Sequence, residues 1–161
     1  DWRPYGRVSP FVFAQGESSL QRRIDLRYNA GAGGKYTVAQ SERTRVDLSL
    51  ALLAEQTFLR DDVPADSEVD ESVLARWSGR FRARRELSGG RVTLSTENFY
   101  RPVFDDFGDY VLESRSSLAY ALSERITLKL SFYDTYDSRA VARGADSNNE
   151  GQILFSLLGQ L

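Results

Sequence analysis

The side chains most able to do chemistry in this sequence are arginines that recur at even spacing. Arg76, Arg80 and Arg82 share one parity, and guanidinium groups bind phosphate or carboxylate oxygens in bidentate pairs. Such a stripe could line an anion-selective passage or a phosphate-binding surface. The structural alternative is that these arginines form ion pairs with Glu97 and Glu113. The near balance of 21 basic and 23 acidic residues favours the ion pairs.

The sequence lacks the residues that the common kinds of catalysis require. The sequence contains no histidine and no cysteine, which removes the usual general base, the Ser-His-Asp triad, thiolate chemistry and disulfides. Asp47 and Glu55 could act as paired carboxylates, but they are more simply ion-pair partners. We therefore expect no enzyme, no cofactor and no metal site. A formal net charge of −2 also argues against a nucleic-acid partner.

Several segments that we expect to be loops are acidic. The carboxylates concerned are Asp61, Asp62, Asp66, Glu68, Asp70, Glu71, Asp105, Asp106, Asp109, Asp137 and Asp146. They could bind divalent cations or bridge lipopolysaccharide, since calcium prefers carboxylate oxygens. No segment matches the spacing of a known calcium loop, so we interpret these residues as solvated loop side chains.

The elements that must position the charges are β-strands, because polar and apolar residues alternate almost from end to end. The clearest stretch sets Ile126, Leu128 and Leu130 against Thr127 and Lys129. About eight such stretches of roughly nine to fourteen residues occur, which is longer than soluble strands and suits tilted membrane strands. No run of about 18 apolar residues occurs, so we expect no spanning helix. A first strand would carry Pro10, which predicts an edge strand or a bulge.

The expected connections alternate between longer and shorter ones. The longer connections are residues 15–21, 59–71, 101–109 and 137–149, and the shorter ones are 39–42, 87–90 and 123–125. Outer-membrane barrels have short periplasmic turns and long outer loops. The sequence therefore predicts an all-β fold, an antiparallel up-and-down transmembrane β-barrel of about eight strands, as a single domain over residues 1–161.

In a membrane barrel the apolar face contacts lipid and the charged face lines the lumen, where unlike charges pair across strands. The predicted lumen residues are Arg27, Arg45, Asp47, Glu55, Arg76, Arg80, Arg82, Glu97, Glu113, Arg115 and Lys129. Aromatic residues such as Tyr100 and Tyr136 near strand ends favour this orientation, because they suit the membrane interface. Gly31 and Gly33 would let a neighbouring backbone approach closely or mark a bend. The alternative is a soluble, periplasmic, lipocalin-like barrel, whose apolar face would enclose a ligand.

Some segments resemble the salt-induced outer-membrane protein family, which is catalogued as domain of unknown function 481. They are residues 7–11, 23–36, 46–55, 128–138 and the Asp-Asp-Phe-Gly-Asp-Tyr of 105–110. The resemblance implies an outer-membrane barrel without known catalysis. Because family members usually carry strands before the region of Arg7, it also implies that this chain could be the C-terminal part of a barrel of roughly twelve strands.

We therefore expect a porin-like protein of the Gram-negative cell envelope, located in the outer membrane, with its signal peptide removed before Asp1. The expected role is structural, or that of a pore for small solutes or ions through an arginine-rich lumen. An accessory role in a larger envelope complex is compatible with both. The expected partners are outer-membrane lipid and small ions or solutes, and the sequence indicates no particular protein partner.

Overall fold

The structure is a computed structural model, and it describes residues 6–22, 24–59 and 73–159. One antiparallel sheet contains eight strands in chain order, with each strand paired to the next. The strands are β1 (Val8–Ser19), β2 (Ile24–Gln40), β3 (Thr44–Leu59), β4 (Leu74–Leu87), β5 (Val92–Pro102), β6 (Tyr110–Ala121), β7 (Ile126–Asp137) and β8 (Asn149–Gly159). Two short 3-10 helices, η1 (Ser88–Gly90) and η2 (Val141–Arg143), lie in connections. The predicted all-β, up-and-down arrangement of eight strands is confirmed.

The connections fall at two ends of the sheet. We call the end at which β1, β3, β5 and β7 finish the loop end, and the end with connections 41–43, 88–91 and 122–125 the turn end. At the turn end, η1 places Gly89 and Gly90 at positive φ, which suits residues without a side chain. The described residues contain no helix long and apolar enough to cross a membrane.

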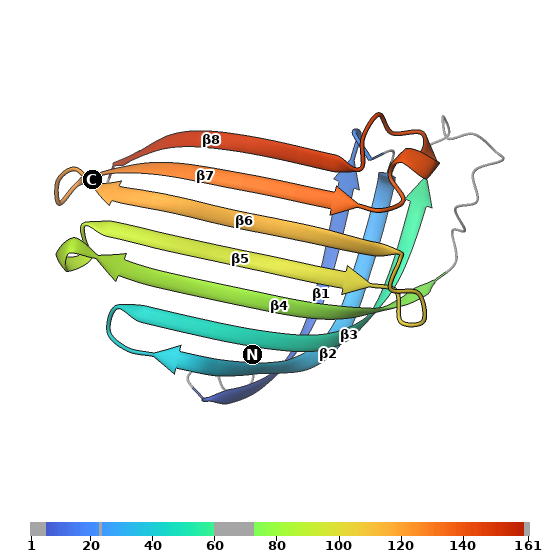
Figure 1. The fold of residues 1–161 in the computed structure, drawn as a ribbon, viewed down its shortest axis with the longest axis horizontal. Helices are drawn as coiled ribbons and strands as arrows, with labels where there is room; N and C mark the ends of the chain where they lie inside the picture. The colour runs from blue at the N-terminus through green and yellow to red at the C-terminus, as the bar shows by residue number, and fades with distance from the viewer. Residues whose placement is uncertain (1–5, 23, 60–72, 160–161) are drawn as a thin grey trace.

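The sheet curls strongly, so that its two edges approach each other at the loop end. In Figure 1, β4 to β8 lie in front, and β1 crosses behind them together with the far parts of β2 and β3. The Ser19 hydroxyl of β1 lies 3.1 Å from a Glu150 carboxylate oxygen of β8. From there the two edge strands diverge, and no ladder joins β1 to β8 within the described ranges.

Glycines on the inner face of β2 allow this curvature. Gly31 and Gly33 lie opposite Leu53 and Ala51 of β3. A Cβ atom on Gly33 would lie 2.3 Å from the Leu50 carbonyl oxygen and 2.5 Å from the Ala51 Cβ. Both distances are too short for real contacts, so this approach of the two strands requires glycine. The predicted close approach at these glycines is therefore confirmed.

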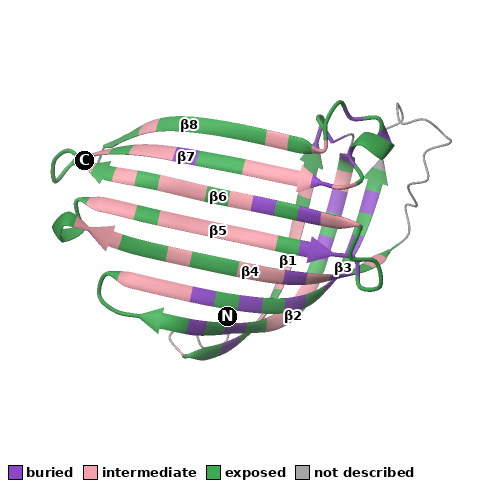
Figure 2. Ribbon diagram, in the orientation of Figure 1, coloured by how far each residue is buried: buried purple, intermediate pink, exposed green. Residues whose placement is uncertain are grey.

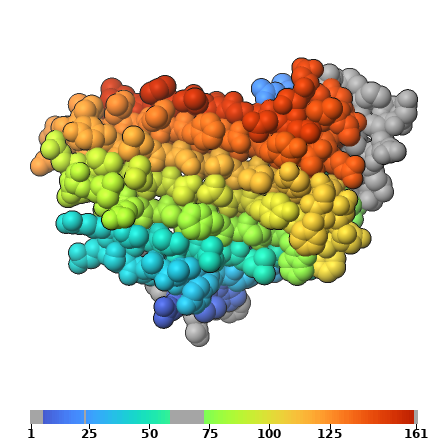
Figure 3. Space-filling view, in the orientation of Figure 1, coloured from blue at the N-terminus to red at the C-terminus, as the bar shows by residue number. Residues whose placement is uncertain are grey.

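The two faces of the sheet differ in composition and in burial. The concave face is polar and charged, and many of its side chains are buried toward the loop end and along β2 and β3 (Figure 2). The convex face carries large apolar side chains that are exposed, for example Leu50 at 59% and Phe155 at 77%. On the side shown in Figure 3, the side chains of β2 to β8 form a continuous surface.

Of the predictions about the first strand, the loop at 15–21 was wrong and the edge position of Pro10 is confirmed. Residues 15–19 extend β1 instead of forming a loop, so the first connection is short. Pro10 lies in β1 itself, which it can do because β1 is an edge strand of the described sheet. At the start of β2, Ile24 departs from the alternation of the strand, because the register shifts between Ile24 and Leu26. The shift turns Ile24 inward, where it is fully buried.

Candidate functional site on the concave face

The strand ladders place the predicted lumen residues on the concave face. Asp47, Arg82, Glu97 and Arg115 are consecutive partners across β3, β4, β5 and β6. The signs of their charges alternate along this row, which is the arrangement that favours attraction between adjacent strands. The other predicted residues lie at even spacing on these four strands, or on the concave face of β2 and β7.

The loop end of the concave face is crossed by ion pairs. A guanidinium nitrogen of Arg27 lies 3.3 Å from a carboxylate oxygen of Asp137. Arg27 belongs to β2 and Asp137 to β7, which are not neighbours in the sheet, so this pair spans the interior from one wall to the other. Arg27 also contacts Glu17 of β1 at 3.2 Å and Glu55 of β3 at 3.7 Å.

Arg76 of β4 extends this group of ion pairs. Its guanidinium lies 2.9 Å from a Glu55 oxygen and 3.0 Å from an Asp109 oxygen. It also donates hydrogen bonds to the backbone carbonyl oxygens of Arg101 and Asp109, each at 3.3 Å. Its side chain is 4% exposed, so these bonds satisfy a buried cation that would otherwise destabilise the fold.

The connection between β7 and β8 folds onto this network. Arg143, in η2, lies 2.5 Å from Asp137 and donates a hydrogen bond to the Arg22 carbonyl oxygen. Arg22 in turn contacts Glu150 of β8 at 3.4 Å. Burial lowers the pKa of the Arg143 guanidinium, and the nearby Arg27 and Arg22 cations lower it as well, while Asp137 opposes both effects.

We call these side chains the loop-end network. It consists of Glu17, Arg22, Arg27, Glu55, Arg76, Asp109, Asp137, Arg143 and Glu150. Four arginines meet five carboxylates, and most of these side chains are buried. When an eight-stranded sheet curls into a barrel, the interior is just wide enough to be filled by side chains. The loop-end network therefore closes the concave side at this end.

Toward the turn end the concave face is more open over β4 to β7, whereas Lys35, Asp47 and Ser49 of β2 and β3 remain buried. The described residues 80–87, 92–100, 114–121 and 126–130 are all exposed or partly exposed. Ion pairs still form there, between Arg80 and Glu97 at 2.9 Å and between Arg45 and Asp47 at 2.9 Å. The edge strands β1 and β8 diverge toward this end (Figure 1), which leaves this half accessible to water and solutes.

Phe99 lies at the boundary between the two halves, with three cations around its ring. The guanidinium carbons of Arg101, Arg80 and Arg115 lie 4.7, 5.8 and 5.8 Å from the ring centroid. The ring face attracts cations and here separates groups that would otherwise repel one another. Glu113 shares its carboxylate between Arg101 at 2.6 Å and Arg115 at 3.0 Å.

The open half carries more cations than carboxylates. Its basic residues are Lys35, Arg45, Arg80, Arg82, Arg84, Arg115 and Lys129, and its acidic residues are Asp47, Glu86, Glu97 and Glu113. Over the part of the chain that the structure describes, Arg82 and Lys129 form no ion pair. The arginine stripe is thus only partly explained by ion pairing: Arg76 and Arg80 are paired, whereas Arg82 retains an unneutralised charge.

A family model described as "Protein of unknown function, DUF481" matches residues 3–158. The chain belongs to the DUF481 family. No curated protein and no solved structure matches it. The predicted resemblance is therefore confirmed over nearly the whole DUF481 chain.

Part of the loop-end network was not predicted from the sequence. Asp109 and Asp137 were interpreted as solvated loop acids, yet Asp137 is 1% exposed and contacts Arg22, Arg27 and Arg143. Asp137 is the last residue of β7, and Asp109 directly precedes β6. These positions beside strands that carry charged side chains were the available signal.

Asp105, Asp106 and Asp146 are exposed, as expected. The acidic residues of 61–71 lie outside the described residues. The described part of the chain contains no cluster suited to a metal ion.

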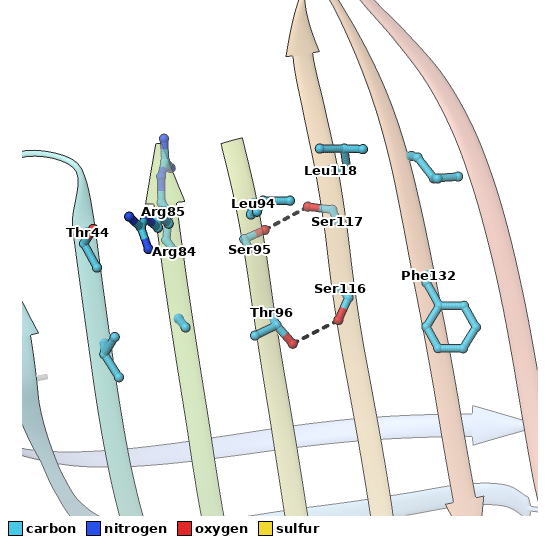
Figure 4. A pocket seen from close by; sticks show the side chains of 13 residues that line it. Thr44, Arg84, Arg85, Leu94, Ser95, Thr96, Ser116, Ser117, Leu118 and Phe132 are labelled. Atoms are coloured by element: carbon cyan, nitrogen blue, oxygen red, sulfur yellow. Dashed lines mark hydrogen bonds between the residues drawn. The ribbon is translucent and has the colours of Figure 1, made fainter. Parts of the chain in front are cut away.

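The convex face of this DUF481 protein is not uniformly apolar. A groove of about 580 Å³ crosses β3 to β7, where Ala83, Thr96 and Ser116 lie between larger side chains. The Thr96 and Ser116 hydroxyls are 2.9 Å apart and bonded to each other (Figure 4). Flanking residues such as Leu118 and Phe132 are apolar. The hydroxyls thus satisfy each other, so this depression is compatible with apolar surroundings.

The Leu128 and Phe132 stripe lies on the exposed convex face, at 44% and 43% exposure. A lipocalin-like protein would require this stripe to line an enclosed cavity. The side chains that face inward from the same strand are instead Lys129 and Ser131. The arrangement of the faces is therefore the opposite of the one that the soluble, ligand-enclosing alternative requires.

Proposed function

We propose that this protein is an integral β-barrel of a Gram-negative outer membrane, with its convex face in contact with lipid. The observation that carries the proposal is the distribution of side chains: apolar residues are exposed on the convex face while charges are buried on the concave face. Leu48, Leu50 and Leu52 of β3 are 47%, 59% and 46% exposed. Repeated over eight strands, this surface would be unfavourable in water and favourable in hydrocarbon.

An aromatic belt near the loop end supports the same orientation. The rings of Tyr100, Tyr110 and Tyr136 form a chain across β5 to β7, with centroid distances of 5.6 and 5.5 Å. On the other side of the sheet Tyr28 and Phe58 pack edge to face at 6.3 Å. Aromatic rings with a polar group suit the membrane–water interface, and barrels carry them as girdles.

We infer that the lumen is a blind, charged cavity and that the barrel is mainly structural. The Arg27–Asp137 pair and the η2 segment cross the loop end, so an ion could pass only if the loop-end network rearranged. Small solutes and ions would enter from the turn end, which in an outer membrane faces the periplasm when the long loops face outward. Porin-like conduction would therefore be low in the resting protein.

The test is to fractionate cells that express the full chain and to follow the protein by gel with and without boiling. We expect recovery in the detergent-extracted outer membrane and a band that shifts on boiling. Recovery as a monodisperse protein without detergent would refute the proposal. Bilayer recordings of the purified protein should show little conductance, and a large steady conductance would contradict the blind lumen.

A matched pair of variants on β6 sharpens the test. Leu118 faces outward and its neighbour Ser117 faces inward. Leu118→Arg places a charge against lipid and should cost about 2–4 kcal/mol of folding free energy in vesicles if it lies near the midplane. Ser117→Arg places the same charge on the polar side and should cost much less. Equal losses would mean that the two faces do not meet different solvents.

A further inference from the structure

The turn-side half of the concave face contains a polar side chain without a partner, placed between two cations. Ser49 of β3 lies beside Lys35 of β2 and Arg80 of β4 in the strand register. The Ser49 hydroxyl is buried, and among the described residues it has no hydrogen-bond partner. A buried hydroxyl without a partner is uncommon, because its desolvation is unfavourable.

The charges around this hydroxyl are predominantly positive. Arg82 follows Arg80 on the same face of β4, and its two register partners, Asp47 and Glu97, are paired with Arg45 and Arg80. The Arg80–Glu97 contact is 2.9 Å long, but the Nε–H of Arg80 is not aligned with an acceptor. The alignment is therefore poor for a hydrogen bond, and we regard the contact as an ion pair in which the buried Nε–H donor stays unsatisfied.

We propose that Lys35, Ser49, Arg80 and Arg82 form a binding site for a small phosphate-bearing anion that enters the concave face from the turn end. A phosphate group offers several acceptor oxygens and negative charge, which match one hydroxyl, one ammonium and two guanidinium groups. The excess of seven basic over four acidic residues on this half attracts such an anion from solution. The site does not require the membrane location proposed above.

The phosphate could belong to a soluble anion or to a lipid headgroup, and the chemistry of the site is the same for both. The experiment is a titration of the full chain, purified in a neutral detergent, by isothermal calorimetry. One arm uses inorganic pyrophosphate and the other uses phosphatidic acid in mixed micelles. Saturable binding in the first arm indicates a soluble anion, and binding in the second arm alone indicates a headgroup.

The decisive comparison is between two arginines of β4 that differ in the face they occupy. Arg82 faces inward, and Arg85 lies on the opposite face, toward the same end of the strand. Arg82→Gln should weaken binding about tenfold, the effect of losing one charge-assisted hydrogen bond. Arg85→Gln should leave binding within about twofold, because exposed charges at a distance are screened by salt.

Two further variants keep the proposal falsifiable if Arg82→Gln alters the fold. Ser49→Ala removes the unpartnered hydroxyl without changing any charge and should weaken binding several-fold, by about the value of one neutral hydrogen bond. Glu97→Gln removes a competing carboxylate and should tighten binding. Equal effects of Arg82→Gln and Arg85→Gln, or no saturable binding in either arm, would overturn the proposal.

Discussion

Asp137 is the most connected carboxylate of the loop-end network, and its replacement by asparagine is the most informative perturbation of the fold. Asp137 contacts Arg143 at 2.5 Å, Arg27 at 3.3 Å and Arg22 at 3.9 Å. It also accepts a hydrogen bond from the Arg139 backbone N–H at 3.0 Å. Asparagine keeps the size of the side chain and this last bond, but it removes the negative charge.

The expected effect follows from burial. Removing one partner of a buried ion pair typically costs about 3–5 kcal/mol, because the remaining charge is left without compensation. Here three arginines lose a shared carboxylate, and Arg27 and Arg143 are 2% and 3% exposed. Glu17 and Glu55 still contact Arg27, so we expect a loss near the lower value, about 3 kcal/mol. That is a large part of the roughly 5–15 kcal/mol of a typical fold.

The assay is urea unfolding of the protein in detergent, followed by far-UV circular dichroism. Asp106→Asn is the matched control, because Asp106 pairs with Arg139 at 3.7 Å and both side chains are about half exposed. An exposed pair contributes about 0–1 kcal/mol. If Asp137→Asn lowered the free energy of unfolding by no more than Asp106→Asn, the loop-end network would not hold the fold as described.

Two other substitutions test the curvature and the aromatic belt. Gly33→Ala should lower the free energy of unfolding by about 1–3 kcal/mol, because its methyl group would clash with β3; Gly34→Ala, which has open space at that position, should stay within about 1 kcal/mol of the parent. Comparable losses in the same urea assay would contradict the close approach. Tyr110→Leu should cost about 1–3 kcal/mol by breaking two ring contacts of about 0.5–1.5 kcal/mol each. Tyr120→Leu on the same strand should cost about 0.5 kcal/mol, as other exposed substitutions do, and equal costs would argue against the belt.

Much of the fold was predictable because the side-chain period of a strand is two. In β7 the alternation of Leu128 and Leu130 with Lys129 and Ser131 fixes which residues share a face, and the structure agrees. The order of the strands followed from short connections such as 122–125, which can join only neighbouring strands. The register shift at Ile24 was not predictable, because a single extra residue reverses the face without any change in composition.

The strand and face of each site residue were predictable from the sequence, but the residues with which it forms ion pairs were not. Even spacing placed Arg76 and Arg80 on one face, and Glu97 was correctly expected to pair with Arg80. Glu113, which was expected to pair with the same stripe, pairs with Arg101 and Arg115 instead. The pairing of Arg27 with Asp137 joins residues 110 positions apart, and it depends on how far the sheet curls. Local periodicity carries no information on that curl. For the same reason, the sequence did not predict that β1 and β8 approach each other at the loop end and diverge toward the turn end.

The central claim is that the convex face meets lipid and the concave face meets water. The chain contains no cysteine, so single cysteines can be introduced and spin-labelled without removing others. Phe132 and Tyr133 are neighbours in β7 on opposite faces, and they are similarly exposed at 43% and 38%. In lipid vesicles, we expect the label at Phe132→Cys to collide with oxygen dissolved in the bilayer, and the label at Tyr133→Cys to collide with a water-soluble nickel chelate. The reverse pattern, or equal access of the chelate to both positions, would contradict the account.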